Sequence, residues 1–238
     1  MLKLIIHRLL KSLKWILVIL VALLVFHLWD FFIIYADQLI LLTYQHLRMI
    51  ALAAPPAILL GVSIGILITR WDRLSTTAIT IAGIIMTIPS IALFGVMIPA
   101  MAPFGAGVGT VPAVIALILY SQLPIIRNTH VALKGVPQGT IKAGRGMGLT
   151  EWQILHKIEI PLAVPTILTG IRQAVIIEIG IAAVAAYIGG GGLGRWIFGG
   201  IRRTYPDMII AGGLMVSLLA IGVDLGLRKI QNWMTAER

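Results

Sequence analysis

Long runs of apolar residues constrain this chain more than any other feature of its sequence. Of its 238 residues, 59% are hydrophobic and only 12% are charged. A water-soluble domain of this length cannot bury so much apolar surface, so the composition requires a lipid bilayer as the solvent. The sequence therefore predicts an all-α, polytopic membrane protein.

The apolar runs also predict the number of membrane crossings. A helix needs about 20 mostly apolar residues to cross a hydrocarbon core of roughly 30 Å. Six runs reach this length: about 14–35, 46–69, 76–101, 108–127, 162–188 and 207–227. A cleaved signal peptide is the alternative interpretation of the first run. We favour a retained span, because the run is longer than a typical signal-peptide core and no small-x-small cleavage site follows it.

The basic residues predict how these spans are oriented, because Lys and Arg are enriched in loops on the cytoplasmic side. With the N-terminus inside, fourteen of the nineteen basic residues fall on that side. Both termini are then cytoplasmic, as is the long connection between the fourth and fifth spans. Loop residues of this kind account for the net charge of +10. No basic stripe with interleaved aromatic residues indicates a nucleic-acid partner.

The long connection is polar and predicts two short helices. A proline at its first position favours a helix over 137–147, and Gly148 supplies a left-handed C-terminal stop. Thr150 and Gln153 have the spacing of a capping box at the start of a second helix. That helix runs to Pro161, where the fifth span is expected to begin.

The same connection resembles the EAA loop of permease subunits in binding-protein-dependent ABC importers. The family pattern runs Glu-Ala-Ala, a glycine after three further residues, and then Ile-x-Leu-Pro. The residues that match it at the required spacing are Ala143, Gly148, Ile158 and Pro161. Gly144 replaces the second alanine and Ile160 replaces the leucine. Lys142 stands where the family usually has glutamate, which puts in question any ion pair made by that glutamate but not the shape of the loop.

The resemblance implies a type I importer fold and a division of labour among subunits. The short helix around 138–147 would be the coupling helix, docked on a cytoplasmic ATPase, and an external binding protein would deliver the ligand. The residues that this assigns to the ATPase-coupling loop are Lys142, Ala143, Gly144, Arg145, Gly146, Met147, Gly148, Ile158 and Pro161. A P-loop needs a Gly-Lys pair, and the chain has none. ATP is therefore expected on a separate subunit, with no cofactor in this chain.

Over about 46–227 the chain resembles, more specifically, the osmoprotectant permeases for glycine betaine, carnitine and choline. The segments that carry this similarity are 93–95, 125–130, 143–148 and 188–194. The implied location is the bacterial inner membrane, and a second permease, either an identical copy or a homologue, is expected as a partner. The chain then divides into 1–45 (cytoplasmic segment and first span), 46–227 (permease core with coupling loop 128–161) and 228–238 (cytoplasmic tail).

Polar residues outside the loop supply two further sets of candidates. Ionised or polar groups within spans usually face a bundle interior or water, so the candidates for the translocation path are Arg172, Glu178, Tyr120 and Gln122. Pairing of the charged ones with other helices for structural reasons is the alternative. Four arginines lie outside against the positive-inside trend, and the three in the loop after the fifth span, Arg195, Arg202 and Arg203, are the candidates for docking the binding protein. Solvated or snorkelling arginines are the alternative there.

Other function classes find little support in the sequence. No hydrolase or metalloprotease motif occurs, and the five histidines are scattered, so neither an enzyme nor a metal site is expected. Two alternatives remain open. One is the same importer with another cargo, such as an amino acid. The other is an ion-coupled secondary carrier, which would predict paired membrane carboxylates and repeated spans.

Overall fold

The computed structural model describes residue 16, residues 19–20 and residues 22–236 of the chain. In this part of the chain the secondary structure is helical and no strand occurs, which confirms the predicted all-α class. The first predicted span, 14–35, lies in part outside the described residues.

The described helices follow one another with short connections. In chain order they are α2 (Trp29–Ile34), α3 (Ala36–Ile68), α4 (Asp72–Thr87), α5 (Ser90–Met101), α6 (Thr110–Lys134), α7 (Gln138–Gly146), α8 (Glu151–Ile154), α9 (Ile160–Ala185), α10 (Gly194–Arg203) and α11 (Pro206–Ala236). Short 3₁₀ turns follow α5 (Ala102–Phe104) and α9 (Ala186–Ile188). A π-helical segment, Leu155–Glu159, joins α8 to α9.

By length and composition, four helical segments of the described chain are able to cross a membrane: Ala36–Ile68, Thr110–Lys134, Glu151–Ile188 and Pro206–Met234. A fifth crossing would combine Arg73–Thr87 with Ser90–Phe104, which meet at an angle of 97°. The predicted span over 76–101 is therefore not one straight helix. Ile88 is extended, with φ −65° and ψ 127°, because the ring of the following Pro89 disfavours the helical conformation before it.

The fifth span begins close to the predicted boundary at Pro161, since α9 starts at Ile160. The second short helix and the fifth span form one continuous helical segment over Glu151–Ile188. Pro161 lies in the first turn of α9, where a missing backbone N–H is tolerated. The change of helix type occurs before the proline, in the π segment.

Helices α3, α6 and α9 form the centre of the bundle, around buried residues that include Ala53, Leu117 and Ile179. Small residues let these helices approach closely. A Cβ atom on Gly61 of α3 would lie 2.6 Å from Ile125 Cγ2 of α6. Helix α4 packs against α6, and α11 packs against α9 and α10.

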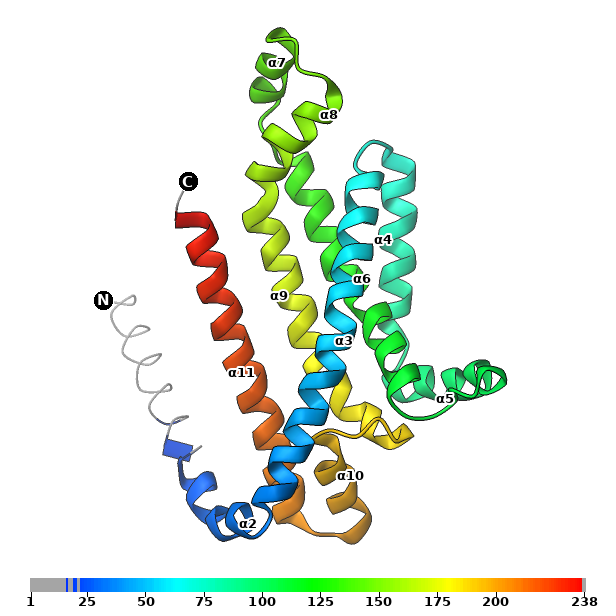
Figure 1. Cartoon of the computed structure of the whole chain (residues 1–238), viewed down its shortest axis with the longest axis vertical. Coiled ribbons are helices and arrows are strands. Elements are labelled where there is room, and N and C mark those ends of the chain that lie inside the picture. The colour runs from blue at the N-terminus through cyan, green and yellow to red at the C-terminus, as the bar shows by residue number, and fades with distance from the viewer. Residues whose placement is uncertain (1–15, 17–18, 21, 237–238) are drawn as a thin grey trace, which may run out of the picture.

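The connections gather at two opposite ends of the bundle (Figure 1). Helices α7 and α8 project beyond one end, which also holds the turn between α3 and α4. The other end holds α2, α10 and the glycine-rich segment that leads into α10. The two sets of loop residues proposed from the sequence therefore lie at opposite ends of the molecule.

Candidate functional site

Helix α7 presents most of its surface away from the bundle. Ile141 and Gly144 are its buried residues, and they pack with Val136, Ile154 and Ile158 in a small apolar cluster. Its exposed residues include Lys142, Ala143, Arg145 and Gly146, and Met147, which follows the helix, is 73% exposed. The side chains of α7 that face outward are thus available to another protein.

Gly144 lets α7 sit close to the π segment. A Cβ atom at this position would lie 2.7 Å from Cδ1 of Ile158. The family pattern has alanine here, and an alanine in this chain would require Ile158 to move. Glycine in place of the usual alanine therefore allows the tight packing between α7 and the start of the fifth span.

The turn after α7 has the predicted chemistry. Gly148 has φ +81°, a left-handed conformation that glycine adopts without steric cost. Thr150 Oγ1 accepts a hydrogen bond from Gln153 N at 3.3 Å, and Thr150 N donates to Gln153 Oε1 at 2.9 Å. The predicted capping box is confirmed.

A chain of ionic contacts connects α7 to the rest of the bundle. Arg145 Nε donates to Glu151 Oε1 at 2.7 Å, and this hydrogen bond raises the pKa of Arg145. Glu151 Oε2 lies 3.7 Å from Arg70 Nη1, in the turn between α3 and α4. Arg70 Nη2 in turn donates to Glu159 Oε2 at 3.1 Å. We call Arg145, Glu151, Arg70 and Glu159 the ionic chain.

The members of the ionic chain differ in burial. The Glu159 side chain is only 6% exposed, whereas the other three are 40% exposed or more. A buried carboxylate is destabilising without a cationic partner. The Arg70–Glu159 contact is therefore the anchor of the ionic chain, that is, the contact whose loss should cost the most. Lys142 takes no part in it, since the described residues include no ion-pair partner for Lys142.

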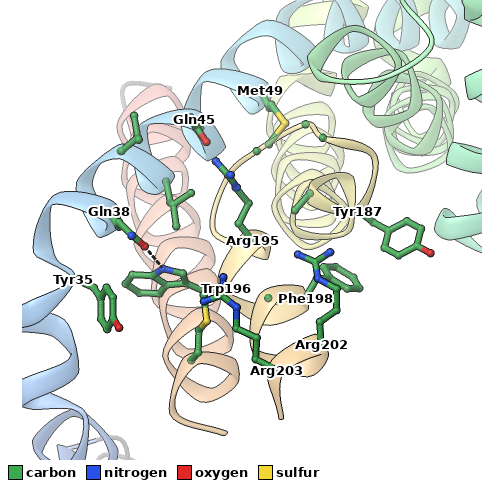
Figure 2. A pocket seen from close by; sticks show the side chains of 18 of the residues that line it. Tyr35, Gln38, Gln45, Met49, Tyr187, Arg195, Trp196, Phe198, Arg202 and Arg203 are labelled. Carbon is green, nitrogen blue, oxygen red and sulfur yellow. Dashed lines mark hydrogen bonds between the residues drawn. The ribbon is translucent and has the colours of Figure 1, made fainter. Parts of the chain in front are cut away.

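The opposite end contains a cavity of about 820 Å³ between α3 and α10. Four arginines line it: Arg48, Arg195, Arg202 and Arg203. Figure 2 shows Arg195, Arg202 and Arg203 projecting from α10, with Gln45 and Met49 of α3 near Arg195. None of the four guanidinium groups has a carboxylate partner among the described residues. The structure thus adds Arg48, more than a hundred residues away, to the three arginines found from the sequence.

Two hydrogen bonds join α3 to the segment around the start of α10 and fix one wall of this cavity. Gly192 N donates to Gln45 Oε1 at 3.1 Å, and Trp196 Nε1 donates to Gln38 Oε1 at 3.4 Å. Gly191 and Gly192 have φ near +80°, so the glycine run makes a tight turn against α3. These contacts fix the direction in which α10 displays its arginines.

Three of the four candidates for the translocation path, Tyr120, Gln122 and Glu178, are buried inside the bundle. Tyr120 donates to the carbonyl of Ile88, and Gln122 Nε2 donates to Ile118 O at 2.7 Å. Glu178 is 0% exposed and accepts a hydrogen bond from Ser121 Oγ at 2.6 Å. These placements are within the packed core of one chain. A role of these residues in a path stays a prediction.

Arg172, the fourth candidate, joins α9 to α11. Its Nε atom lies 3.2 Å from Asp224 Oδ1, and Asp224 Oδ2 accepts from Arg228 Nη2 at 3.1 Å. Charged groups within a membrane protein are stabilised by such pairing. Arg172 is therefore paired with another helix, which is the alternative stated from the sequence.

The sequence analysis missed a cluster of three polar side chains on the surface of the bundle, where α6 packs on α9. Arg127, Asn128 and Gln173 line a second cavity of about 380 Å³, and Gln173 is exposed near the middle of α9. A single amide inside a long apolar run was the available signal. Only the packing of α6 on α9 brings the three side chains together.

Comparison with known proteins identifies the family of the chain. Residues 57–235 match the model of the family described as the binding-protein-dependent transport system inner membrane component. The chain belongs to this family. It is a transmembrane permease component of an ABC importer, and the partner classes that the family implies are an ATPase and a substrate-binding protein.

Named relatives agree with this family assignment. The chain is 50% identical over 200 residues to the osmoprotectant import permease protein OsmW of Salmonella typhimurium, an alignment that covers 84% of this chain and 93% of OsmW. It is 39% identical to the carnitine transport permease protein OpuCB of Listeria monocytogenes, covering 83% of this chain and 88% of that protein. It is 38% identical to the choline transport system permease protein OpuBB of Bacillus subtilis, covering 88% and 94%.

Solved structures of ABC transporters share the fold. A chain of the inward-facing MetNI methionine ABC transporter superposes with a TM-score of 0.73 at 26% identity, covering 83% of this chain and 96% of that chain. A chain of an amino acid ABC transporter gives a TM-score of 0.68 at 18% identity, covering 87% and 96%. The predicted type I importer fold is confirmed, and the alternative of an ion-coupled carrier is not supported.

Proposed function

We propose that this permease carries a quaternary-ammonium osmoprotectant, such as glycine betaine, carnitine or choline, across the bacterial cytoplasmic membrane. The observation that carries the substrate class is the 50% identity to an osmoprotectant import permease over 84% of the chain. Two other relatives, named for carnitine and choline, are nearly as long as this chain and align over most of it. The chain itself is not an enzyme in this proposal, and ATP is hydrolysed by its partner.

Helix α7 is the proposed contact with the ATPase. Its outward face is free, and its other face is fixed by the Gly144–Ile158 packing. The ionic chain then links α7 to the turn between α3 and α4 and to the start of α9. A displacement of α7 by the ATPase would therefore move α3 and α9, two of the three central helices. The proposal puts α7 in the cytoplasm, and the basic residues of the sequence predict both termini on the same side.

The cavity between α3 and α10 is the proposed docking site for the binding protein. Four guanidinium groups without a described carboxylate partner match a protein that presents Asp or Glu side chains. Complementary charge raises the rate of encounter between partners. The permease would pair with a second permease, either an identical copy or a homologue, to complete the path.

The test is reconstitution of the permease with its ATPase and binding protein in proteoliposomes. Uptake of an osmoprotectant is expected only when ATP and the binding protein are both present. Uptake that survives ATP depletion, or purification in mild detergent without any associated ATPase, would contradict the proposal.

Lys142 allows a sharper test of the ATPase contact. The substitution Lys142→Glu restores the charge of the family pattern on an exposed face and breaks no described ion pair. If Lys142 is matched to its own ATPase, affinity for that ATPase is expected to fall by about tenfold through charge reversal. Lys229→Glu, an exposed lysine on α11, is the control and should leave the affinity unchanged.

A further inference from the structure

A groove on the surface of the bundle carries polar groups from two helices that are long and apolar enough to cross a membrane. The cavity of about 380 Å³ lies between α4, α6 and α9, and its polar lining consists of Arg127, Asn128 and Gln173. Gln173 belongs to α9 and Arg127 to α6, both of which are membrane-crossing helices. Polar side chains on such helices are costly against lipid and usually face water or protein. Lipid is thus the least favourable environment for this face.

The packing of α6 on α9 builds the groove. A Cβ atom on Gly170 would lie 2.6 Å from Asn128 Cβ and 2.7 Å from Pro124 O, so only glycine allows this approach. Asn128 Nδ2 donates to Pro124 O at 2.8 Å and to Gln173 Oε1 at 3.4 Å. These bonds hold both amides in place at the groove. They leave Asn128 Oδ1 and Gln173 Nε2 without a described partner.

Arg127 gives the groove its charge. Its side chain is exposed, and no carboxylate of the described chain pairs with it. It lies seven residues before Lys134 at the end of α6, which is about 10 Å along a helix. An unpaired guanidinium in a partly apolar groove is suited to binding a carboxylate, because the charge-assisted hydrogen bonds are strong there.

The remaining lining suits the other half of a betaine-type molecule. Met86, Ile176 and Ile177 provide an apolar wall. A trimethylammonium group has no N–H to donate, so it packs against apolar and polarizable side chains and faces acceptor oxygens such as Asn128 Oδ1. Choline carries the same cationic group but has no carboxylate for Arg127.

We propose that this groove is the chain's contribution to the translocation path, and that Arg127 favours zwitterionic cargo with a carboxylate over the choline cation. The inference rests on the proposed osmoprotectant function. It moves the path away from Glu178, which is fully buried between α6 and α9, to the open face of the same two helices.

The first experiment measures uptake of glycine betaine, carnitine and choline by the reconstituted importer. Arg127→Gln is expected to lower uptake of the two carboxylates by about tenfold, from the loss of a charge-assisted hydrogen bond. Choline uptake should change by less than about threefold, and Arg127→Lys should restore part of the carboxylate uptake. Arg73→Gln, an exposed arginine outside the groove, is the control.

The outcomes separate this inference from the proposed function. A wild-type importer that takes up none of the three compounds overturns the function, and the groove with it. A wild-type importer that takes up only choline, or an Arg127→Gln variant that loses all substrates equally, overturns the carboxylate role alone. Assembly with the ATPase is measured for each variant, so that loss through misfolding is recognised.

The second experiment uses the absence of cysteine from the chain. In the assembled importer, Gln173→Cys is expected to react with a membrane-impermeant thiol reagent, and saturating glycine betaine should slow the reaction. Leu59→Cys on α3, a position 70% exposed on an apolar helix, should stay unreactive. Equal reactivity of the two cysteines would overturn a water-filled path at this groove.

Discussion

The two ends of this permease treat their charged residues in opposite ways. At the α7 end, Arg145 and Arg70 are matched by Glu151 and Glu159 in a chain of contacts between 2.7 and 3.7 Å. At the α10 end, four arginines surround a cavity without a described carboxylate partner. Charges that are already paired stiffen a structure, whereas unpaired charges of one sign attract a partner of opposite charge. The comparison indicates that the α7 end is a rigid element held by ion pairs, whereas the α10 end is a surface that can bind an acidic partner.

Removal of the Arg70–Glu159 contact, the most buried part of the ionic chain, should have the largest effect. Arg70→Gln leaves Glu159 buried without a cation, which is expected to cost on the order of 2 kcal/mol after allowance for the partial exposure of Arg70. Osmoprotectant uptake should fall by about tenfold or more while the ATPase stays bound. Thermal unfolding in detergent and uptake in proteoliposomes measure the two effects.

A charge exchange tests whether the contact itself matters. The double variant Arg70→Glu with Glu159→Arg keeps an ion pair at the same place and should recover part of both losses. Arg73→Gln, on the same side of the bundle, is the matched control. If Arg70→Gln behaves like this control, the ionic chain has no part in coupling.

Reversing charge at the α10 end should act only on the binding protein. Arg195→Glu with Arg202→Glu is expected to weaken binding-protein affinity by about tenfold, mainly through slower association, and to remove its dependence on salt. Association kinetics at several salt concentrations provide the measurement. Affinity for the ATPase should not change, and a change there would show that the two ends are not independent.

The smallest expected effect is local to the turn after α7. Thr150→Ala removes one half of the capping box and should destabilise the helix start by about 1 kcal/mol. Because the cap lies beside Glu151, coupling should weaken only slightly. Thr150→Ser retains the hydroxyl and is the control. Hydrogen exchange over 150–155 would detect the change, and equal exchange in the two variants would contradict it.

Local features of the fold were predictable from the chain. The left-handed Gly148 and the Thr150–Gln153 capping box depend on a few neighbouring residues, so their geometry follows from their order. The long apolar runs predicted the membrane class for a similar reason, because hydropathy is a property of each segment. The bend after Ile88 was missed, since an apolar run on both sides of Pro89 concealed it.

Features that join distant segments were not predictable. Arg48 enters the α10 cavity, Arg172 pairs with Asp224, and Asn128 meets Gln173 only after α3, α6, α9 and α11 pack together. No pattern within a single segment indicates which face of a helix its neighbour will cover. For the same reason the sequence singled out Glu178 as polar but did not show that it is buried.

Short stretches of the sequence were sufficient to predict that this chain spans a membrane, that one connection is a capped polar element, and that ATP is hydrolysed by another subunit. These conclusions follow from hydropathy, capping chemistry and the missing P-loop, which all act within short stretches of chain. The tertiary structure alone decided which charges are paired, which arginines share a cavity and where a polar groove opens. Such outcomes depend on close helix contacts, like that of Gly170 with Asn128, that form only when residues far apart in the chain meet.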